Sequence, residues 1–473
     1  MTDIFIEQKL IFDSFPIDVI KIPIPFIDEC KFGILNLKAI STPYTKDNLE
    51  IIFMIDNSGS MSEFCSDNRT KMQHIIHTIK HMILYFKENS SINVWITVDT
   101  FCDKIQQIVE RTSITNDNYE LIIQNVQKIA PDGCTNIKHA LKSIQTSADK
   151  IMDEHPEHTI INMFMTDGED TCGNSSNNLI QYLNPNITNI FIGFGNEHDS
   201  YLLTSLSDSI VNGKYYFIDK IENSGLVYGE ILHSIVYKLL KDVSIFVENG
   251  LIYNYKTNTW NSSLLIGDVI SESDKTYHII STIPEQCVVS ISNNVVNITK
   301  ELVDKNLTNF MYRQRTLQYL YMVSNKHKHK YMYNGINIKE LLRTFIDEIT
   351  KYMTDNEMMD DKFLKNLCDD IYISYKTFNT KFGGMYNTAR QTSQGTQRCY
   401  TVNDTENLFS IPKIPILRRN NNYLSDNEDE ENDDLFNYSV SDFADTPYLT
   451  QTATQIMREF SNYSPSNQTD INY

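Results

Sequence analysis

The chain has 473 residues, of which 41% are hydrophobic and 22% charged. This length exceeds what one hydrophobic core usually supports, so we expect two or three domains. The formal net charge of −20 would repel a phosphate backbone and argues against nucleic acid as the main partner. The sequence holds no run of 18 apolar residues, so we expect no membrane span.

The first residues and the cysteines indicate the compartment. The chain begins with MTDIFIEQKLIFDSF, which has acids where a signal peptide needs a basic region and an unbroken apolar core. Eight scattered cysteines form no CxxC pair, so neither a zinc ribbon nor a compact disulfide framework is indicated. We therefore expect a cytoplasmic protein with reduced thiols. Its richness in Asn, Ile, Lys and Tyr suggests an AT-rich genome such as that of a protist or a large virus, and for a virus the location would be the host cytoplasm or the virion.

The N-terminal segment, residues 1–47, has an extended pattern. Pro23 and Pro25 interrupt it, and Phe32–Leu37 has the alternation of a strand. The segment either pairs with a β domain further along the chain, which would make the intervening unit an insertion, or stands apart. The sequence leaves both arrangements open.

Residues 48–241 alternate between apolar strand-like runs and helical patterns, which predicts an α/β domain with a doubly wound, mostly parallel, Rossmann-like sheet. The run Ile51–Ile55 is short, continuous and followed by polar residues, as expected of a central strand. Apolar residues at three- and four-residue steps from Met72 to Phe86 predict the next helix. The remaining expected strands are Ile92–Phe101, Thr159–Met165, Ile187–Phe194 and Lys214–Ile218, and the remaining expected helices are Asn136–Met152, Asp199–Leu206 and Ser224–Leu240.

In the rest of the chain the hydrophobic pattern of the sequence changes twice. Residues 242–300 show strand alternation, which predicts a small antiparallel β domain. Residues 301–398 carry helical periodicity and predict a helical domain. Residues 399–473 form an acidic tail that we expect to be mostly disordered, because seven of the nine residues 426–434 are acidic. A short helix at 447–460 is the exception that we expect there.

Three separate fragments carry oxygen ligands. They are Asp56-Asn-Ser-Gly-Ser60, Asp132-Gly-Cys-Thr-Asn136 and Thr166-Asp-Gly168. In a parallel sheet, loops at the carboxyl ends of neighbouring strands meet at the switch point, where ligands bind. Hydroxyl and carboxylate oxygens suit a hard cation. The predicted metal ligands are Asp56, Ser58, Ser60, Thr135 and Asp167.

The charge of this set predicts what the metal does. Two carboxylates at most, with neutral hydroxyls for the rest, leave a divalent ion electrophilic and one coordination position open. A Glu or Asp of a partner protein is the natural remaining ligand. We therefore expect a module that binds a protein partner through Mg²⁺, with Mn²⁺ or Ca²⁺ as alternatives.

In this order the three motifs resemble the von Willebrand factor A family. The resemblance runs from about Phe32 to Leu240, and Gly133–Thr171 looks most like the inter-alpha-trypsin-inhibitor and plant RING-associated type. It implies a complete metal-ion-dependent adhesion site at the five positions named above. No RING array of cysteine and histidine follows, so ubiquitin-ligase activity is not implied.

Two other functions compete with this prediction. A structural or assembly protein would use the same site for self-association. A metal-assisted hydrolase is disfavoured, because no histidine lies in the three ligand loops and Ser58 has no evident activator. We therefore expect no enzymatic activity.

Other polar groups lie near these motifs or have metal-like spacing. We expect solvated or loop-capping roles for Asp99, Cys102 and Asp103, and a solvated loop for Glu169 and Asp170. The pairs His155/His158 and His327/His329 lie in charged, loop-like stretches, where we expect exposed histidines.

Overall fold

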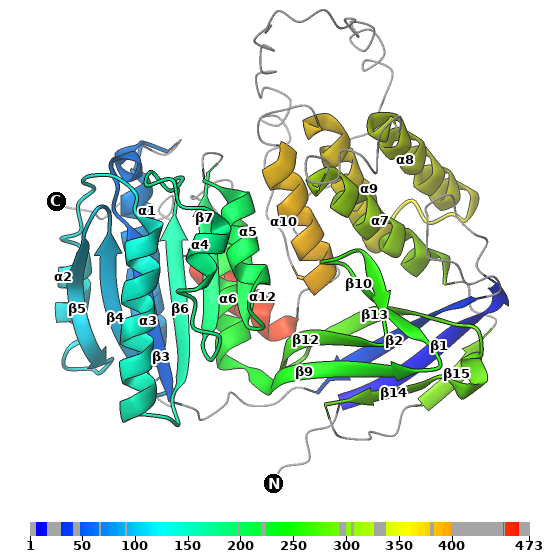
Figure 1. The fold of residues 1–473 in the computed structure, drawn as a ribbon, viewed down its shortest axis with the longest axis horizontal. Helices are drawn as coiled ribbons and strands as arrows, with labels where there is room; N and C mark the ends of the chain where they lie inside the picture. The colour runs from blue at the N-terminus through cyan, green and yellow to red at the C-terminus, as the bar shows by residue number, and fades with distance from the viewer. Residues whose placement is uncertain are drawn as a thin grey trace, which may run out of the picture.

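The computed structural model shows an α/β domain beside two β sheets and a group of helices (Figure 1). It describes residues 6–16, 30–40, 48–65, 68–89, 92–195, 198–218, 224–292, 299–303, 307–325, 337–378, 383–398, 448 and 450–462. The acidic run 426–434 and the pair His327/His329 lie outside these residues. None of the described helices is both long and apolar enough to cross a membrane.

The α/β domain is built on a six-stranded sheet. In spatial order its strands are β5 (Ile105–Ser113), β4 (Val94–Phe101), β3 (Leu49–Asp56), β6 (Thr159–Thr166), β7 (Thr188–Phe194) and β8 (Gly213–Ile218). All neighbours are parallel except β4 and β5. The chain moves outward from β3 to β4 on one side and to β6 on the other, so β3 is the switch point. The predicted fold class is confirmed.

Helices cover both faces of this sheet, which explains the continuous apolar run of β3. Phe53 shares a core with α1, α2 and α6, whereas its neighbours Ile52 and Met54 share a second core with α3, α4 and α5. The helices are α1 (Lys71–Glu88), α2 (Tyr119–Val126), α3 (Ile137–Glu154), α4 (Ser176–Ile180), α5 (Ser200–Asp208) and α6 (Ser224–Val236).

The end of α6 differs from the prediction. The helix was expected to reach Leu240, but it ends at Val236, and Lys238 already begins a strand. The Tyr237 amide still donates to the His233 carbonyl, at 3.0 Å. Beyond that point burial alternates along the chain, because one side of the strand faces the core between the two β sheets.

The β sheets enclose their own core. One has the order β11-β10-β13-β2-β1-β15 and the other the order β12-β9-β14. Leu35 of one sheet and Ile245 of the other are buried in this core. The strands are β1 (Ile6–Pro16), β2 (Lys31–Ala39), β9 (Lys238–Glu248), β10 (Leu251–Asn254), β11 (Thr259–Asn261), β12 (Ser263–Ile270), β13 (Asp274–Ser281), β14 (Val288–Ile291) and β15 (Thr299–Val303).

The N-terminal strands belong to this β part. Strand β2 pairs with β13, and β1 pairs with β2 and, in parallel, with β15. Of the two arrangements that the sequence left open, the structure therefore has the one in which the α/β domain lies between two pieces of the β part.

The remaining helices link the two parts. Met385 and Tyr386 of α10 reach into a core of the α/β domain, while α7, α8 and α9 pack around Phe345. Helix α12 lies along α6 so closely that a Cβ at Gly229 would come within 2.7 Å of the Met457 Cα. The helices are α7 (Thr308–Ser324), α8 (Ile338–Asp355), α9 (Lys362–Thr377), α10 (Gly383–Thr396) and α12 (Gln451–Asn462), with short 3-10 turns η1 (Gly59–Ser62) and η3 (Pro284–Gln286).

Candidate metal site

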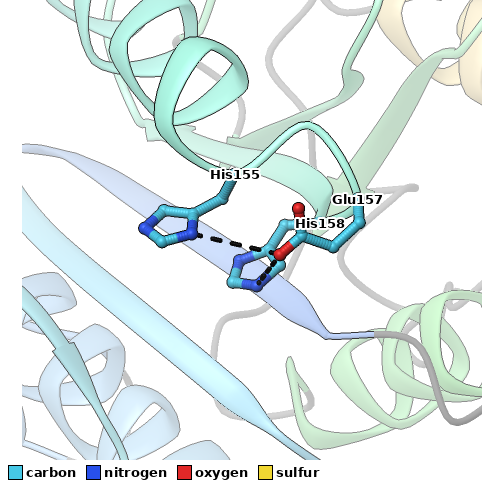
Figure 2. A group of neighbouring side chains, drawn as sticks. All are labelled: His155, Glu157 and His158. Atoms are coloured by element: carbon cyan, nitrogen blue, oxygen red, sulfur yellow. Dashed lines mark ion pairs between the residues drawn. The ribbon is translucent and has the colours of Figure 1, made fainter.

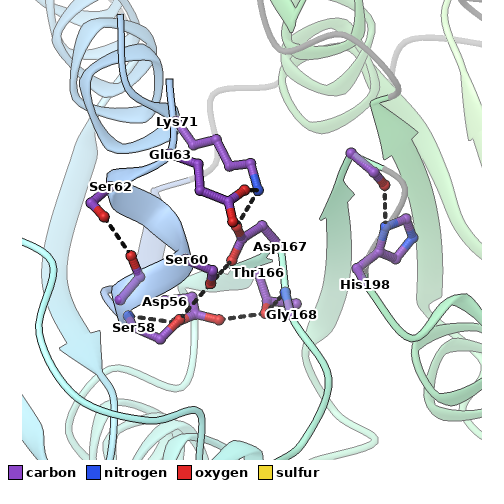
Figure 3. Close-up of polar contacts among 12 residues, drawn as sticks. Asp56, Ser58, Ser60, Ser62, Glu63, Lys71, Thr166, Asp167, Gly168 and His198 are labelled. Atoms are coloured by element: carbon purple, nitrogen blue, oxygen red, sulfur yellow. Dashed lines mark hydrogen bonds and ion pairs between the residues drawn. The ribbon is translucent and has the colours of Figure 1, made fainter. Parts of the chain in front are cut away.

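Three loops meet at the carboxyl edge of the parallel strands, and Figure 3 shows residues of two of them, Asp56 to Ser60 and Thr166 to Gly168. Asp56 is the last residue of β3, and Asp167 directly follows the neighbouring strand β6. Thr135 immediately precedes Asn136, which caps α3 by accepting a hydrogen bond from the His139 amide. The topology therefore brings the three motifs together, as the switch-point rule requires.

Four of the predicted ligands are joined by hydrogen bonds. The Ser58 and Ser60 hydroxyl oxygens lie 3.1 Å apart, and the Ser60 hydroxyl donates to Asp167 Oδ1 at 2.7 Å. The Ser58 amide donates to Asp56 Oδ1 at 2.8 Å. Two carboxylates and two hydroxyls thus share one small volume.

Gly168 shows that Thr135 faces the same volume. A Cβ atom added at Gly168 would lie 3.4 Å from Thr135 Oγ1, 3.9 Å from Ser60 Oγ and 4.0 Å from Asp56 Oδ2. The structure therefore brings together all five side chains, and the glycine leaves space beside their oxygens. This all-oxygen set fits Mg²⁺, which binds through a few protein oxygens and keeps several waters.

Burial sets the electrostatics of the site. Asp56 is fully buried, and this raises its pKa to about 6 although hydrogen bonds from Thr166 and Ser58 oppose the rise. Asp167 is 1% exposed, and its negative charge raises the Asp56 pKa further. Two buried carboxylates this close favour a cation between them.

Thr166 and Lys71 also contact the candidate ligands, and the sequence did not predict these two roles. The Thr166 hydroxyl donates to Asp56 Oδ2 at 2.5 Å. Lys71 Nζ lies 2.7 Å from Asp167 Oδ2 and 2.6 Å from Glu63 Oε2. A lysine in the first turn of a helix lies at the positive end of the helix dipole, which is unfavourable. This position in the sequence could therefore have indicated that Lys71 pairs with a carboxylate.

Backbone contacts fix the ligand loops. The Gly59 amide donates to the Gly133 carbonyl at 3.1 Å, and the Thr171 amide and hydroxyl both donate to the Thr135 carbonyl, at 3.0 and 2.8 Å. Asp170 Oδ1 accepts from the Ile137 amide at 3.1 Å. The expectation of a solvated loop is therefore wrong for Asp170, whose carboxylate ties the third loop to the start of α3.

The polar residues Asp99, near the end of β4, and Cys102 and Asp103, which follow the strand, lie in different surroundings. The Cys102 carbonyl accepts from the Asn136 amide at 3.0 Å, and the Asp103 carbonyl lies 3.2 Å from His139 Nδ1, so both residues hold the loop before α3. Asp99 is neither solvated nor a cap: it is 3% exposed, and its Oδ1 has no hydrogen-bond partner among the described residues. Its burial raises its pKa to about 6.

A second cluster, His155, Glu157 and His158, lies just before β6 and so at the opposite edge of the sheet (Figure 2). The expectation of exposed histidines is wrong for His158, whose side chain is 5% exposed. Its Nδ1 lies 2.7 Å from Glu50 Oε1, and its Nε2 lies 3.2 Å from Glu157 Oε1.

The geometry of that cluster favours a structural role. The two imidazole rings are stacked with 14° between their planes, so one ion cannot lie in both ring planes as coordination requires. The Glu50 carboxylate, which is 1% exposed, is instead stabilised by His158 and by a hydrogen-bonded ion pair with Arg111.

Figure 3 also labels His198, a histidine that lies outside the three ligand loops. Its Nδ1 lies 2.8 Å from the Gly195 carbonyl and its Nε2 lies 2.7 Å from the Tyr215 hydroxyl. This arrangement suits a neutral ring that donates from Nδ1 and accepts at Nε2. Burial lowers the His198 pKa to about 4. Both nitrogens are engaged within the protein, so His198 is not placed to act as a base.

Comparison with solved structures supports the fold. A von Willebrand factor type A protein from Catenulispora acidiphila aligns with a TM-score of 0.50 at 11% identity, covering 83% of this chain and 96% of that one. The ArnB paralog VWA2 from Sulfolobus acidocaldarius aligns with a TM-score of 0.46 at 11% identity, covering 83% and 98%. Proximal thread matrix protein 1 from the mussel byssus, with a zinc-occupied MIDAS motif, aligns with a TM-score of 0.31 at 16% identity, covering 40% and 46%.

The sequence itself matches one family model. No curated protein matched the chain. The model for the von Willebrand factor type A domain matches residues 50–229. This segment starts at β3 rather than at Phe32, and β2, which contains Phe32, belongs to the other sheet. Together with the sheet order and the likeness to the Catenulispora structure, the match shows that residues 50–229 of this chain form a von Willebrand factor type A domain.

Proposed function

We propose that this domain is a metal-dependent protein-interaction module, which binds an acidic group of a partner through Mg²⁺ held by Asp56, Ser58, Ser60, Thr135 and Asp167. Such domains are commonly interaction modules. The observation that carries the proposal is the convergence of three hydroxyls and two buried carboxylates beside Gly168.

The five residues would have two different roles in binding the ion. Hydroxyl oxygens of Ser58, Ser60 and Thr135 are the neutral ligands that would hold the ion, and the two carboxylates would supply the compensating charge directly or through water. Because three of the five groups are neutral, two carboxylates at most offset the charge of the divalent ion, which stays electrophilic with one coordination position open toward solvent. A partner carboxylate is the ligand that this open position attracts. We propose binding rather than catalysis, since His198 is committed to Gly195 and Tyr215.

The test is affinity capture from cell extract on the immobilised full chain. We expect a set of proteins to be retained in Mg²⁺, to elute with EDTA and to be lost with Ser60→Ala. Ser62→Ala is the matched control, because its exposed hydroxyl bonds only to the Gly59 carbonyl in the described structure. Retention of the same proteins by Ser60→Ala, or in EDTA, contradicts the proposal. Light scattering with and without Mg²⁺ identifies the case in which the partner is a second copy of the chain.

A further inference from the structure

A cavity of about 460 Å³ opens where the α/β domain, the β sheets and the helices meet. It is lined by parts of β8, α6, β12, β13 and α7 and by residues that follow α10. The five candidate metal ligands do not line it. Pockets that bind small molecules measure roughly 300 to 1,000 Å³, so the volume suits a metabolite.

Positive charges from three parts of the fold converge on this cavity. They are Lys214 of β8, Lys275 of β13 and Arg398, which follows α10. Neither lysine forms an ion pair within 4.0 Å of a described carboxylate. Burial, and then repulsion by Lys214, lowers the Lys275 pKa to about 8. The two lysines of this cavity therefore repel one another, at an energetic cost that a bound anion would remove.

The acidic residues of the cavity do not balance these charges. Asp268 is paired with Lys238 at 2.6 Å and also attracts Lys214, and Asp208 is paired with Lys256 at 2.8 Å. Among the described lining residues, Glu230 is the one other carboxylate, so it and the shared Asp268 offset Lys214, Lys275, Arg313 and Arg398. Burial raises the Glu230 pKa to about 7, which weakens even that compensation. This excess of positive charge occurs in a chain whose net charge is −20.

An orphaned donor lies in the same wall. Arg313 is 2% exposed, and its guanidinium donates to the carbonyls of Thr276 and Gln394 at 2.8 and 2.7 Å. Its Nε has no acceptor among the described residues, and His278 Nε2 has no hydrogen-bond partner among them either. Both side chains line the cavity. Buried polar atoms without partners call for an explanation, and a bound ligand is one.

We propose that this cavity binds a small organic phosphate, with its phosphate group between Lys214, Lys275 and Arg398. A phosphate monoester carries about −1.5 to −2 charges near neutral pH, which matches two unpaired lysines better than the single charge of a carboxylate does. The cavity is also much larger than bare phosphate needs, since one water occupies about 30 Å³. The Tyr277 side chain lines the remaining space and suits the organic part, whereas the Tyr216 ring is covered by the Arg398 guanidinium, 3.8 Å from the ring centroid.

The proposal is tested by calorimetry and thermal unfolding of the full chain with four probes: inorganic phosphate, pyrophosphate, AMP and glucose 6-phosphate. Adenosine and glucose are the uncharged controls. We expect AMP or glucose 6-phosphate to bind more tightly than inorganic phosphate and to raise the Tm, because a ligand that binds only the folded state stabilises it. Absence of binding by all four probes overturns the proposal, as does equal binding of adenosine and AMP.

Variants assign the binding to the cavity. Lys275→Gln and Lys214→Gln should each weaken binding about tenfold or more, the loss that corresponds to roughly 1.4 kcal/mol. Lys275→Arg should retain it, which separates loss of charge from loss of fold. Lys365→Gln, on α9 and paired with Asp360, is the matched control. Unchanged affinity in both glutamine variants contradicts the assignment. Mg²⁺ uptake at the candidate metal site should be unaffected in all of them, so the two proposals fail separately.

Discussion

Lys71 Nζ lies 2.7 Å from Asp167 Oδ2, while the other oxygen of the same carboxylate accepts a hydrogen bond from the Ser60 hydroxyl. The Asp167 carboxylate is therefore shared between an ammonium group and the cluster of candidate ligands. Lys71 is 15% exposed and belongs to the first turn of α1, so its charge is partly shielded from water. It follows that a cation beside Asp167 must coexist with a fixed positive charge.

Replacing Lys71 with glutamine should increase the affinity for Mg²⁺. At an effective dielectric constant near 20, a unit charge about 5 Å from a divalent ion is repelled by several kcal/mol, and even partial relief would raise the affinity about tenfold. Calorimetric titration measures this change. Lys150→Gln, an exposed position on α3, is the control and should match the wild type. Weaker binding by Lys71→Gln would show that Lys71 supports the site instead of competing with the ion.

Replacing Gly168 with alanine should abolish Mg²⁺ binding and leave the fold intact. The new methyl group would lie 3.4 Å from Thr135 Oγ1 and would fill the space beside the ligand oxygens. Gly59→Ala is the matched control in the first ligand loop, because its added Cβ would meet only the Gly133 carbonyl oxygen, at 3.8 Å. Titration and circular dichroism check both variants. Normal metal uptake by Gly168→Ala would show that the ion, if any, binds elsewhere.

His198 should make the protein less stable as the pH falls. Its pKa is about 4 in the folded protein, against 6.5 for an ordinary histidine. Between these values the unfolded chain binds more protons than the native state. The stability that neutral His198 contributes is therefore complete above about pH 6.5 and is lost as the pH falls to about 4. This pKa difference between the folded and the unfolded state corresponds to roughly 3 kcal/mol in the free energy of unfolding, at about 1.4 kcal/mol per pKa unit.

Urea unfolding between pH 7 and pH 4.5 measures this effect. His198→Gln should show a shallower loss of stability than the wild type, although His81 and His233, whose pKa values burial also lowers, keep part of the slope in both proteins. Parallel curves for the two proteins would contradict the assignment of a neutral ring to His198.

Replacing Arg111 with methionine should destabilise the α/β domain by about 2 to 4 kcal/mol, since the buried Glu50 carboxylate loses its guanidinium partner. Arg111 also lies over the Trp95 ring, at 4.3 Å from its centroid, and methionine retains part of that packing. Denaturant unfolding gives the value. Lys128→Met, at an exposed position after α2, should change the stability little.

The sequence predicted the parts of the fold in which local pattern and tertiary packing agree. The strand at Ile51–Ile55 and the helix from Met72 to Phe86 are buried on the faces that their periodicity indicates. The edge strand β5 was missed, because it is largely polar and only Val109 is well buried. The end of α6 was misplaced, since its last turn runs almost directly into β9 and only the packing of the β sheets distinguishes the two.

The residues of the candidate metal site were likewise predicted only in part. Its five ligands could be named because each lies in a short motif next to a strand or a helix end. Lys71, Thr166 and Asp170 could not be assigned, because their roles depend on distances across the fold, such as the 3.1 Å from Asp170 Oδ1 to the Ile137 amide. The charged cavity was equally hidden, since Lys214, Lys275 and Arg398 are far apart in sequence.

Calorimetric titration of Mg²⁺ into the purified chain, with Ser60→Ala and Ser62→Ala measured beside it, is the most direct test of the proposed metal site. We expect one ion per chain for the wild type and for Ser62→Ala, and binding weakened at least tenfold for Ser60→Ala, a loss of about 1.4 kcal/mol or more. No uptake of Mg²⁺ or Mn²⁺ by the wild type, or equal uptake by all three proteins, would contradict the account.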